Sequence, residues 1–299
     1  MNYNYVFVLS MPRSGSTLFR MLLSNVDGCV SLPETFFFPF YNQYKYIDIT
    51  SVEGKNKLID NWINFYTVKL SISNLEELKV ELINQVVSFK DILNVTVKQY
   101  LKENNISNPK YIIEKSPPHI FFQKDIKQLF PNSKAIYLIR DPRSVAGSML
   151  NKKWATHNIY SIARSWNKSC ETVGLISNSA YVRYEDLVDK DAASFEKIKS
   201  LLVTSISKEE FYNKSEEVNF KGVIKDYHPN LSSPITNKHS KKWVSQLSSL
   251  DQEIQIIEHV CKKEMIKWDY EFSNAPKSKA FWFLLFTDAV KFAIAKFSK

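Results

Sequence analysis

The chain has 299 residues, of which 44% are hydrophobic and 14% aromatic, so it can bury a sizeable core and is not a largely disordered chain. The formal net charge of +9 indicates an anionic ligand, substrate or surface. Basic and acidic residues are interspersed, which does not favour nucleic acid as the partner. Three cysteines without paired spacing favour neither a disulfide framework nor a zinc site, and they fit a reducing compartment.

The domain organisation is predicted from the absence of linker sequences between the expected strands and helices. No Gly/Ser-rich or Pro-rich linker is visible between residues 5 and 272, so we expect one domain over residues 1–272 and a tail helix over residues 273–299. The apolar stretch at residues 5–9 is too short for the hydrophobic segment of a signal peptide and has no basic flank. The expected location is therefore cytoplasmic, with membrane association possible through the tail.

The pattern of apolar residues predicts alternating strands and helices. Strands are expected at residues 5–10, 111–114, 135–139 and 181–184. Helices are expected at residues 16–26, 52–70, 75–104, 119–130, 143–151, 157–177 and 250–263. This order predicts an α/β fold in which a P-loop-type parallel β-sheet is flanked by helices. Sheets of this type bind ligands at the carboxyl ends of their strands.

The loop between the first strand and the first helix, residues 10–18, is the first candidate site. Gly15 lets the backbone approach a ligand closely, and the helix start leaves N–H groups free for an anion. Arg13 adds a cation that can bind two oxygens at once. The other loop residues expected to bind phosphate are Ser14, Ser16, Thr17 and Leu18. Ser16 stands where the nucleotide-kinase pattern GxxxxGK[ST] has lysine, which weakens an ATP or GTP interpretation.

A second anion site is predicted at the end of the 135–139 strand. Arg140 follows this strand directly, and Asp141-Pro142 is a strong helix start. Ser148 lies eight positions beyond Arg140, along the next helix. An arginine and a hydroxyl placed in this way can share one phosphate. The alternative is structural, with a salt-bridged arginine at the strand end and a small serine used in packing.

Residues 12–18 and 134–148 resemble the 5'-phosphosulfate loop and the 3'-phosphate element of the PAPS-dependent sulfotransferase superfamily. PAPS is 3'-phosphoadenosine-5'-phosphosulfate. The resemblance extends over residues 5 to about 245 and is weak between residues 36 and 108, where acceptor choice would be expected to lie. It implies transfer of a sulfuryl group from PAPS to an acceptor hydroxyl, without a metal. It also implies that Arg140 and Ser148 bind the 3'-phosphate.

Such a transfer requires a general base, and Glu34, His119 and His157 are the candidates near the motifs. Glu34 lies 21 positions beyond Arg13. In this Glu-Thr context it is similar to the base of the tyrosylprotein sulfotransferases. The resemblance therefore favours Glu34, with Arg13 as a further catalytic cation. A structural glutamate at a helix start or on the surface is the alternative.

The segment 114–119 resembles the Lys-Thr-His segment of the cytosolic sulfotransferases, which carries a catalytic lysine and the base histidine. The lysine is present as Lys115, while Pro117 occupies the histidine position. Lys115 is expected to stabilise charge on the departing phosphate. His119, two residues further on, remains a second candidate base, although a structural role at a helix start is more common.

Three further residues are expected near the nucleotide because of the same resemblance. Tyr184 belongs to a strand and turn whose tyrosine reaches the nucleotide in the superfamily, although it could equally be a packing residue. Ser240 and Lys241 lie in a segment similar to the late basic element over the phosphates, or else on a solvated surface. The aromatic cluster at residues 36–46 is either core or the lining of an acceptor pocket.

The tail at residues 280–297 is rich in Phe, Trp and Leu but is too charged to span a bilayer. Thr287, Asp288, Lys291 and Ser298 fall on one side of a helix. This leaves an apolar face that could contact a membrane surface, a partner subunit as in a homodimer, or the domain's own core. Contact with protein is slightly favoured over contact with a membrane. Two other functions remain open for the chain, a P-loop nucleotide-dependent kinase and a non-catalytic nucleotide-binding adaptor.

Overall fold

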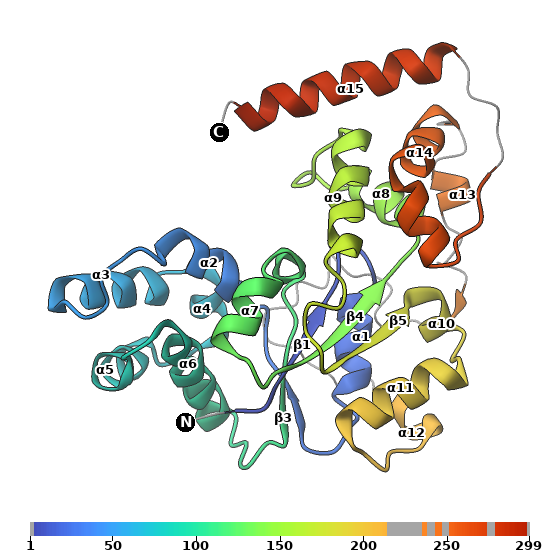
Figure 1. The fold of residues 1–299 in the computed structure, drawn as a ribbon. Helices are drawn as coiled ribbons and strands as arrows, with labels where there is room; N and C mark the ends of the chain where they lie inside the picture. The colour runs from blue at the N-terminus through green and yellow to red at the C-terminus, as the bar shows by residue number, and fades with distance from the viewer. Residues whose placement is uncertain (1–2, 214–234, 238–242, 247–250, 274–278, 298–299) are drawn as a thin grey trace.

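The computed structural model describes residues 3–213, 235–237, 243–246, 251–273 and 279–297 (Figure 1). Its sheet has five strands, all parallel, in the order β2-β3-β1-β4-β5. The strands are β1 (Tyr5–Leu9), β2 (Cys29–Ser31), β3 (Tyr111–Glu114), β4 (Lys134–Ile139) and β5 (Ser179–Arg183). The predicted α/β fold with a parallel sheet is confirmed. Strand β2 was not predicted, because its three half-buried residues give no clear apolar run.

The predicted helical segments form helices, some of them divided by breaks, whereas the helices at residues 37–44, 184–188, 192–202, 208–212 and 243–246 were not predicted. The segment 52–70 is divided at residues 64–65, and the segment 75–104 is divided at Ser88, which begins a new helix in a capping box with Asp91. The first helices are α1 (Ser16–Leu23), α2 (Phe37–Tyr44), α3 (Val52–Ile63), α4 (Tyr66–Ser71), α5 (Leu75–Gln85), α6 (Phe89–Glu103), the 3-10 helix η1 (Pro117–Phe121) and α7 (Gln123–Leu129). The later ones are α8 (Pro142–Leu150), α9 (Ile159–Glu171), α10 (Tyr184–Val188), α11 (Ala192–Leu202), α12 (Lys208–Tyr212), α13 (Trp243–Gln246), α14 (Asp251–Lys267) and α15 (Lys279–Phe297).

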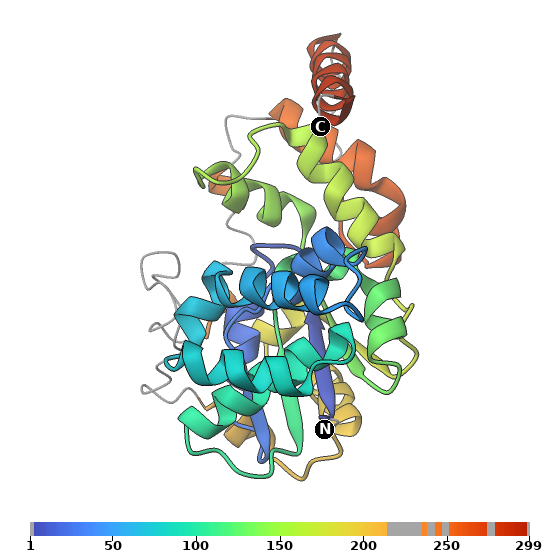
Figure 2. The ribbon, with the colours of Figure 1, turned by 90° about the vertical axis from the view of Figure 1, so that its left-hand side faces the viewer.

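Successive side chains of β1 point to opposite faces of the sheet, so the core has two layers, one on each face. Phe7 and Leu9 pack with α2–α7, whereas Val6 and Val8 pack with α1 and α10–α12 (Figures 1 and 2). All of these side chains are almost completely buried, and full burial of such a side chain contributes about 1.5–3 kcal/mol. A parallel strand covered on both faces is apolar throughout, as the sequence of β1 is.

A third core cluster lies beyond the end of β4, where α8, α9, α14 and α15 pack together around Trp166. The tail helix α15 contacts α9 and α14, with Phe281 fully buried. Asp288 also faces the protein, since its side chain is buried and its carbonyl accepts a hydrogen bond from Asn158. In the described part of the chain, no helix is both long enough and apolar enough to cross a bilayer.

The strand order places the ends of all five strands along one edge of the sheet. Leu32 continues the pairing of β2 with β3, because its N–H donates to the carbonyl of Ile113. Along this edge the strands β2, β3, β1, β4 and β5 lead in turn to Glu34, Lys115, the loop at residues 10–18, Arg140 and Tyr184. Residues that are far apart in sequence therefore meet at the ligand-binding edge of a parallel sheet.

Candidate active site

The loop at residues 10–18 turns sharply between β1 and α1. Arg13 and Gly15 both have left-handed backbone conformations, with φ of 69° and 89°. The N–H of Ser14 bonds to the carbonyl of Met11, and α1 begins at Ser16. A Cβ atom on Gly15 would lie 2.4 Å from the ring of Tyr184. The turn therefore depends on glycine at this position, and it directs the N-terminus of α1 toward the edge of the sheet.

The two predicted anion sites are in direct contact. Arg13 Nε donates to Ser148 Oγ at 3.0 Å, and Arg140 Nη1 donates to the carbonyl of Arg13 at 2.9 Å. Burial, and then the charge of Arg140, lower the pKa of Arg13. Two cations held side by side repel one another, so an anion that both can contact is stabilised here.

Tyr184 connects the two anion sites from the end of β5. Its buried ring lies against Gly15, and the guanidinium of Arg140 lies over the same ring at 4.2 Å from the centroid. A cation over an aromatic face is attracted by the ring quadrupole. Tyr184 thus sets the position of Arg140 relative to the loop.

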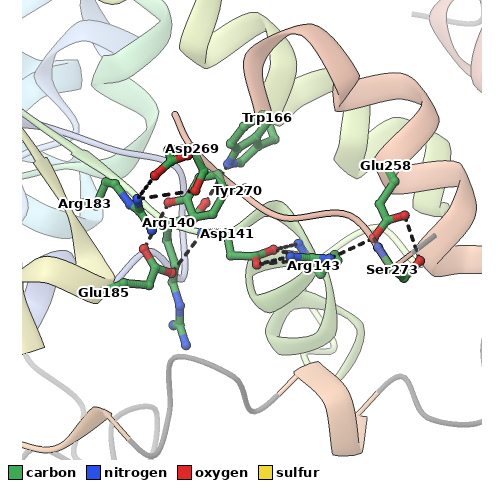
Figure 3. A network of polar contacts seen from close by, with 10 residues as sticks. All are labelled: Arg140, Asp141, Arg143, Trp166, Arg183, Glu185, Glu258, Asp269, Tyr270 and Ser273. Atoms are coloured by element: carbon green, nitrogen blue, oxygen red, sulfur yellow. Dashed lines mark hydrogen bonds and ion pairs between the residues drawn. The ribbon is translucent and has the colours of Figure 1, made fainter. Parts of the chain in front are cut away.

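The turn after β4 is held by partly buried hydrogen bonds (Figure 3). The indole of Trp166 donates to the carbonyl of Arg140 at 2.9 Å, and the N–H of Asp141 donates to Glu185 at 3.2 Å. Tyr270 donates to the other Glu185 oxygen at 3.0 Å. Burial, with a contribution from the charge of Asp141, raises the pKa of Glu185. Glu185 therefore holds the backbone that carries Arg140.

A second group of contacts in Figure 3 anchors the start of α8 to the C-terminal region. Asp141 caps the helix by accepting from the N–H of Arg143 at 2.8 Å, and its carboxylate also pairs with the Arg143 guanidinium at 2.7 Å. Arg143 in turn pairs with Glu258 of α14 at 2.8 Å, and Glu258 accepts two hydrogen bonds from Ser273. The helix that carries Ser148 is thereby connected to α14.

On the other side of the loop, Lys115 forms an ion pair with Glu34. The Lys115 side chain is 1% exposed and that of Glu34 is 33% exposed, so the lysine is inside and the carboxylate faces outward. Lys115 Nζ also lies 3.4 Å from the hydroxyl of Thr17 in the loop. Burial lowers the pKa of Lys115, while the charge of Glu34 opposes this shift. The carboxylate of Glu34, the ammonium group of Lys115 and the loop at residues 10–18 are thus adjacent.

His119 lies in the core rather than at the edge of the site. Its Nδ1 is 2.7 Å from a Glu114 oxygen, and its Nε2 accepts a hydrogen bond from the N–H of Phe38. The ring is fully buried and packs edge-on against Phe38. Both ring nitrogens are occupied inside the protein, whereas the Glu34 side chain is 33% exposed.

Two charged residues of this region were missed by the sequence interpretation. Glu114 is fully buried at the end of β3. Burial alone would raise its pKa, but His119 and then the hydroxyls of Ser116 and Thr35 outweigh this effect, so its pKa lies below the usual value. Arg20 donates to the carbonyl of Leu32 at 2.8 Å, and burial lowers its pKa to about 10. Both residues are charges within apolar segments, a signal that could have indicated buried polar partners.

An apolar pocket lies beside Glu34 in the layer formed by α3, α4 and α6. Pro33 and Thr35, the neighbours of Glu34 in sequence, line it. The remaining lining residues are Leu32, Trp62, Thr67, Val68, Ser71, Ile72, Leu93, Thr96, Val97 and Tyr100. The aromatic cluster at residues 36–46 contributes Phe37, Phe38 and Phe40 to the core, all of them buried.

The remaining predicted residues take several positions. In the loop, Ser14, Ser16 and Thr17 are buried and Leu18 is half-buried. His157 is exposed before α9. Ser240 and Lys241 lie outside the described residues. In the described part of the chain, no cluster of three or more His, Cys, Asp or Glu side chains is arranged to hold a metal ion.

The comparison with known families follows the same region of the chain. Residues 5–205, which include the loop, Glu34, Lys115, Arg140 and Tyr184, match the family described as "Sulfotransferase family". The chain belongs to this sulfotransferase family. The predicted resemblance is therefore confirmed at the level of the family.

Individual relatives are distant. A Caenorhabditis briggsae protein named as a protein-tyrosine sulfotransferase is 24% identical over 207 residues, which cover 66% of this chain and 64% of that protein. A Caenorhabditis elegans protein with the same name is 27% identical over 124 residues, covering 38% of this chain and 48% of that protein. The matches thus span less than two thirds of the length of these relatives.

Two solved structures share the fold. The sulfotransferase domain from the curacin biosynthetic pathway has a TM-score of 0.59 and 20% identity, covering 91% of this chain and 99% of that domain. The sulfotransferase domain of the Synechococcus PCC 7002 olefin synthase has a TM-score of 0.58 and 23% identity, covering 91% of this chain and 96% of that domain. These similarities establish the architecture of the sheet and its helices.

Proposed function

We propose that this protein transfers a sulfuryl group from PAPS to an acceptor hydroxyl, with Glu34 as the general base. The contact between Arg13 Nε and Ser148 Oγ, at 3.0 Å, is the observation that carries the proposal. It joins the loop expected to bind the 5'-phosphosulfate to the element expected to bind the 3'-phosphate. A nucleotide with anionic groups at both positions matches two such sites at neighbouring strand ends.

The residues present fit this nucleotide. The N–H groups at the start of α1 and the guanidinium of Arg13 would bind the 5'-phosphosulfate, while Arg140 and Ser148 would bind the 3'-phosphate. Gly15 permits the turn of this loop, since the ring of Tyr184 takes the space that a Cβ atom would need. The pKa of Arg13 is lowered by burial and by Arg140, and a bound anion would offset both effects.

Glu34 and Lys115 account for the chemical step. Glu34 accepts the proton of the acceptor hydroxyl as its oxygen bonds to sulfur, and the sulfur–oxygen bond to the 5'-phosphate breaks. Lys115 stabilises the negative charge that develops on the departing phosphate. Glu34 forms an ion pair with Lys115, and the 33% exposure of its side chain leaves it reachable from solvent.

The proposed acceptor is a hydroxyl of a tyrosyl side chain, a lipid, a carbohydrate or a small alcohol. The names of the two nematode relatives support including tyrosyl peptides among the acceptors to be tested. A cytoplasmic location is proposed with the activity, because the three cysteines are free thiols.

The test separates binding from chemistry. Calorimetry with adenosine 3',5'-bisphosphate should show binding that Arg13→Ala and Arg140→Ala each weaken by more than about tenfold. Glu34→Gln should bind this nucleotide nearly as the unchanged protein does, yet lose about 10²–10⁴-fold in turnover. Glu53→Gln, which changes an exposed carboxylate on α3, is the matched control and should leave both quantities unchanged. Labelled PAPS with tyrosyl peptides, lipids, carbohydrates and small alcohols identifies the acceptor.

Two other outcomes would replace the proposal. Mg²⁺-dependent ATP turnover without affinity for PAPS or its product would indicate a kinase, against which Ser16 in the lysine position argues. Full PAPS binding without transfer to any acceptor, with Glu34→Gln unchanged in every respect, would indicate a non-catalytic adaptor.

A further inference from the structure

The tail helix α15 has a second apolar face that points away from the rest of the protein. On its inner face Phe281 is fully buried and Phe292 packs against Tyr160 of α9. On its outer face Phe283 and Phe286 are 72% and 68% exposed. In both Figure 1 and Figure 2, α15 lies at the outer end of the molecule, beyond α9 and α14 from the sheet.

The exposed residues form a continuous stripe. Phe283, Phe286, Val290 and Ile294 follow at intervals of three and four residues, so they lie along one side of the helix. Ile294 is 62% exposed and Val290 is 39% exposed. Proteins in solution rarely expose several large apolar side chains in one patch, and such patches mark interaction surfaces.

The orientation of the helix was not evident from the sequence. Its polar residues Thr287, Asp288 and Lys291 were expected to share one side, opposite an apolar face for which packing on protein was slightly favoured. Asp288 is instead buried toward α9, while aromatic residues face outward. Within the part of the chain that the structure describes, one of the two apolar faces of this helix is covered.

The charge of the tail indicates what covers the outer face. Residues 273–299 contain five lysines and one acidic residue, Asp288. Of the lysines whose side chains are described, Lys279 is exposed, and Lys291 is 70% exposed although it pairs with Asp288 at 3.5 Å. Two copies of such a helix would bring like charges together, whereas a bilayer with anionic headgroups would attract them.

We propose that the outer face of α15 binds the surface of a membrane rich in anionic lipids. Phe283, Phe286 and Val290 insert at the level of the headgroups, and the lysines beside them contact lipid phosphates and carboxylates. An apolar stripe combined with flanking lysines is typical of helices that lie in the plane of a bilayer surface. This binding is independent of sulfuryl transfer, and α15 contributes no residue to the site described above.

The proposal is tested with the full chain and vesicles. Co-sedimentation should show binding to vesicles of equimolar phosphatidylcholine and phosphatidylserine, weak binding to phosphatidylcholine alone, and a decrease as salt is added. The triple variant F283Q/F286Q/V290Q should lower the affinity more than about tenfold. Lys279→Gln and Lys291→Gln should each lower it by up to about fivefold, and only on the anionic vesicles.

The controls keep the result interpretable. The variant V52Q/L70Q/V87Q removes three apolar side chains that are 78%, 59% and 81% exposed far from α15 in sequence, and it should bind as the unchanged protein does. Circular dichroism and thermal unfolding should be the same for all variants. Equal binding to both kinds of vesicle, or undiminished binding by the α15 triple variant, would contradict the proposal. A dimer in solution that this variant dissociates, with no vesicle binding, would show that a second copy covers the face.

Discussion

The ring of Tyr184 occupies the space that a side chain on Gly15 would need. The Cβ position of Gly15 lies 2.4 Å from two carbons of this ring, and Gly15 has a φ of 89°. Two separate constraints, the left-handed backbone and the packed ring, therefore require glycine in the loop. The guanidinium of Arg140 packs on the same ring, so the shape of the loop and the position of Arg140 are coupled.

Gly15→Ala is expected to weaken nucleotide binding. The left-handed conformation costs a residue with a Cβ about 1–2 kcal/mol, and the methyl group must also displace Tyr184. The affinity for adenosine 3',5'-bisphosphate should fall more than about tenfold by calorimetry. Gly174→Ala is the control, because Gly174 has a φ of 97° but its Cβ would meet only the Tyr181 hydroxyl, at 3.3 Å. If both variants lost affinity equally, the contact with Tyr184 would not be the cause.

Lys115→Met should reduce turnover more than nucleotide affinity. Methionine preserves much of the buried aliphatic stem, so the fold should persist, while the charge beside Glu34 and Thr17 is lost. Removal of one group that stabilises developing charge costs about 10²–10³-fold in kcat. Single-turnover kinetics with labelled PAPS would measure the chemical step, and calorimetry the affinity. A fall in affinity with kcat unchanged would assign Lys115 to ground-state binding alone.

His119→Ala is expected to act on stability. The substitution leaves the fully buried Glu114 without its imidazole partner, a change that typically costs about 3–5 kcal/mol. Denaturant unfolding would measure the loss, and turnover per folded molecule at low temperature should stay within about threefold of the unchanged protein. An inactive variant with undiminished stability would instead make His119 a catalytic residue, in place of the proposed role of Glu34.

Glu185→Gln should change how stability depends on pH. A carboxyl whose pKa is raised in the folded state stabilises the protein below its unfolded pKa, and this contribution is lost as pH rises through the folded pKa. The Gln variant can still accept from the N–H of Asp141 and has no such loss. The free energy of unfolding of Glu185→Gln minus that of the unchanged protein should therefore be larger at about pH 8 than at about pH 5. Thermal unfolding at both values tests this, and the opposite trend would mean that Glu185 is stabilised as a carboxylate.

The local sequence determined four of the five strands, the turn at residues 10–18 and the helix start at Asp141. Buried parallel strands are apolar throughout, and the turn at Gly15 and the helix start at Asp141 follow from backbone and capping preferences of those residues. These signals span only a few positions, so they can be read without tertiary contacts. The family resemblance then indicated Glu34 and Lys115 as partners in one site, although nothing in their spacing places them together.

Only the tertiary structure decided which of these residues meet and which face inward. The pairing of β2 with β3 brings Glu34 to Lys115, and the pairing of β1 with β4 brings Arg13 to Ser148. The burial of His119 on Glu114 and the outward apolar face of α15 depend in the same way on packing between distant segments. Sequence patterns report the preferences of neighbouring residues, whereas burial and charge pairing depend on the whole chain, which is why these features could not be predicted.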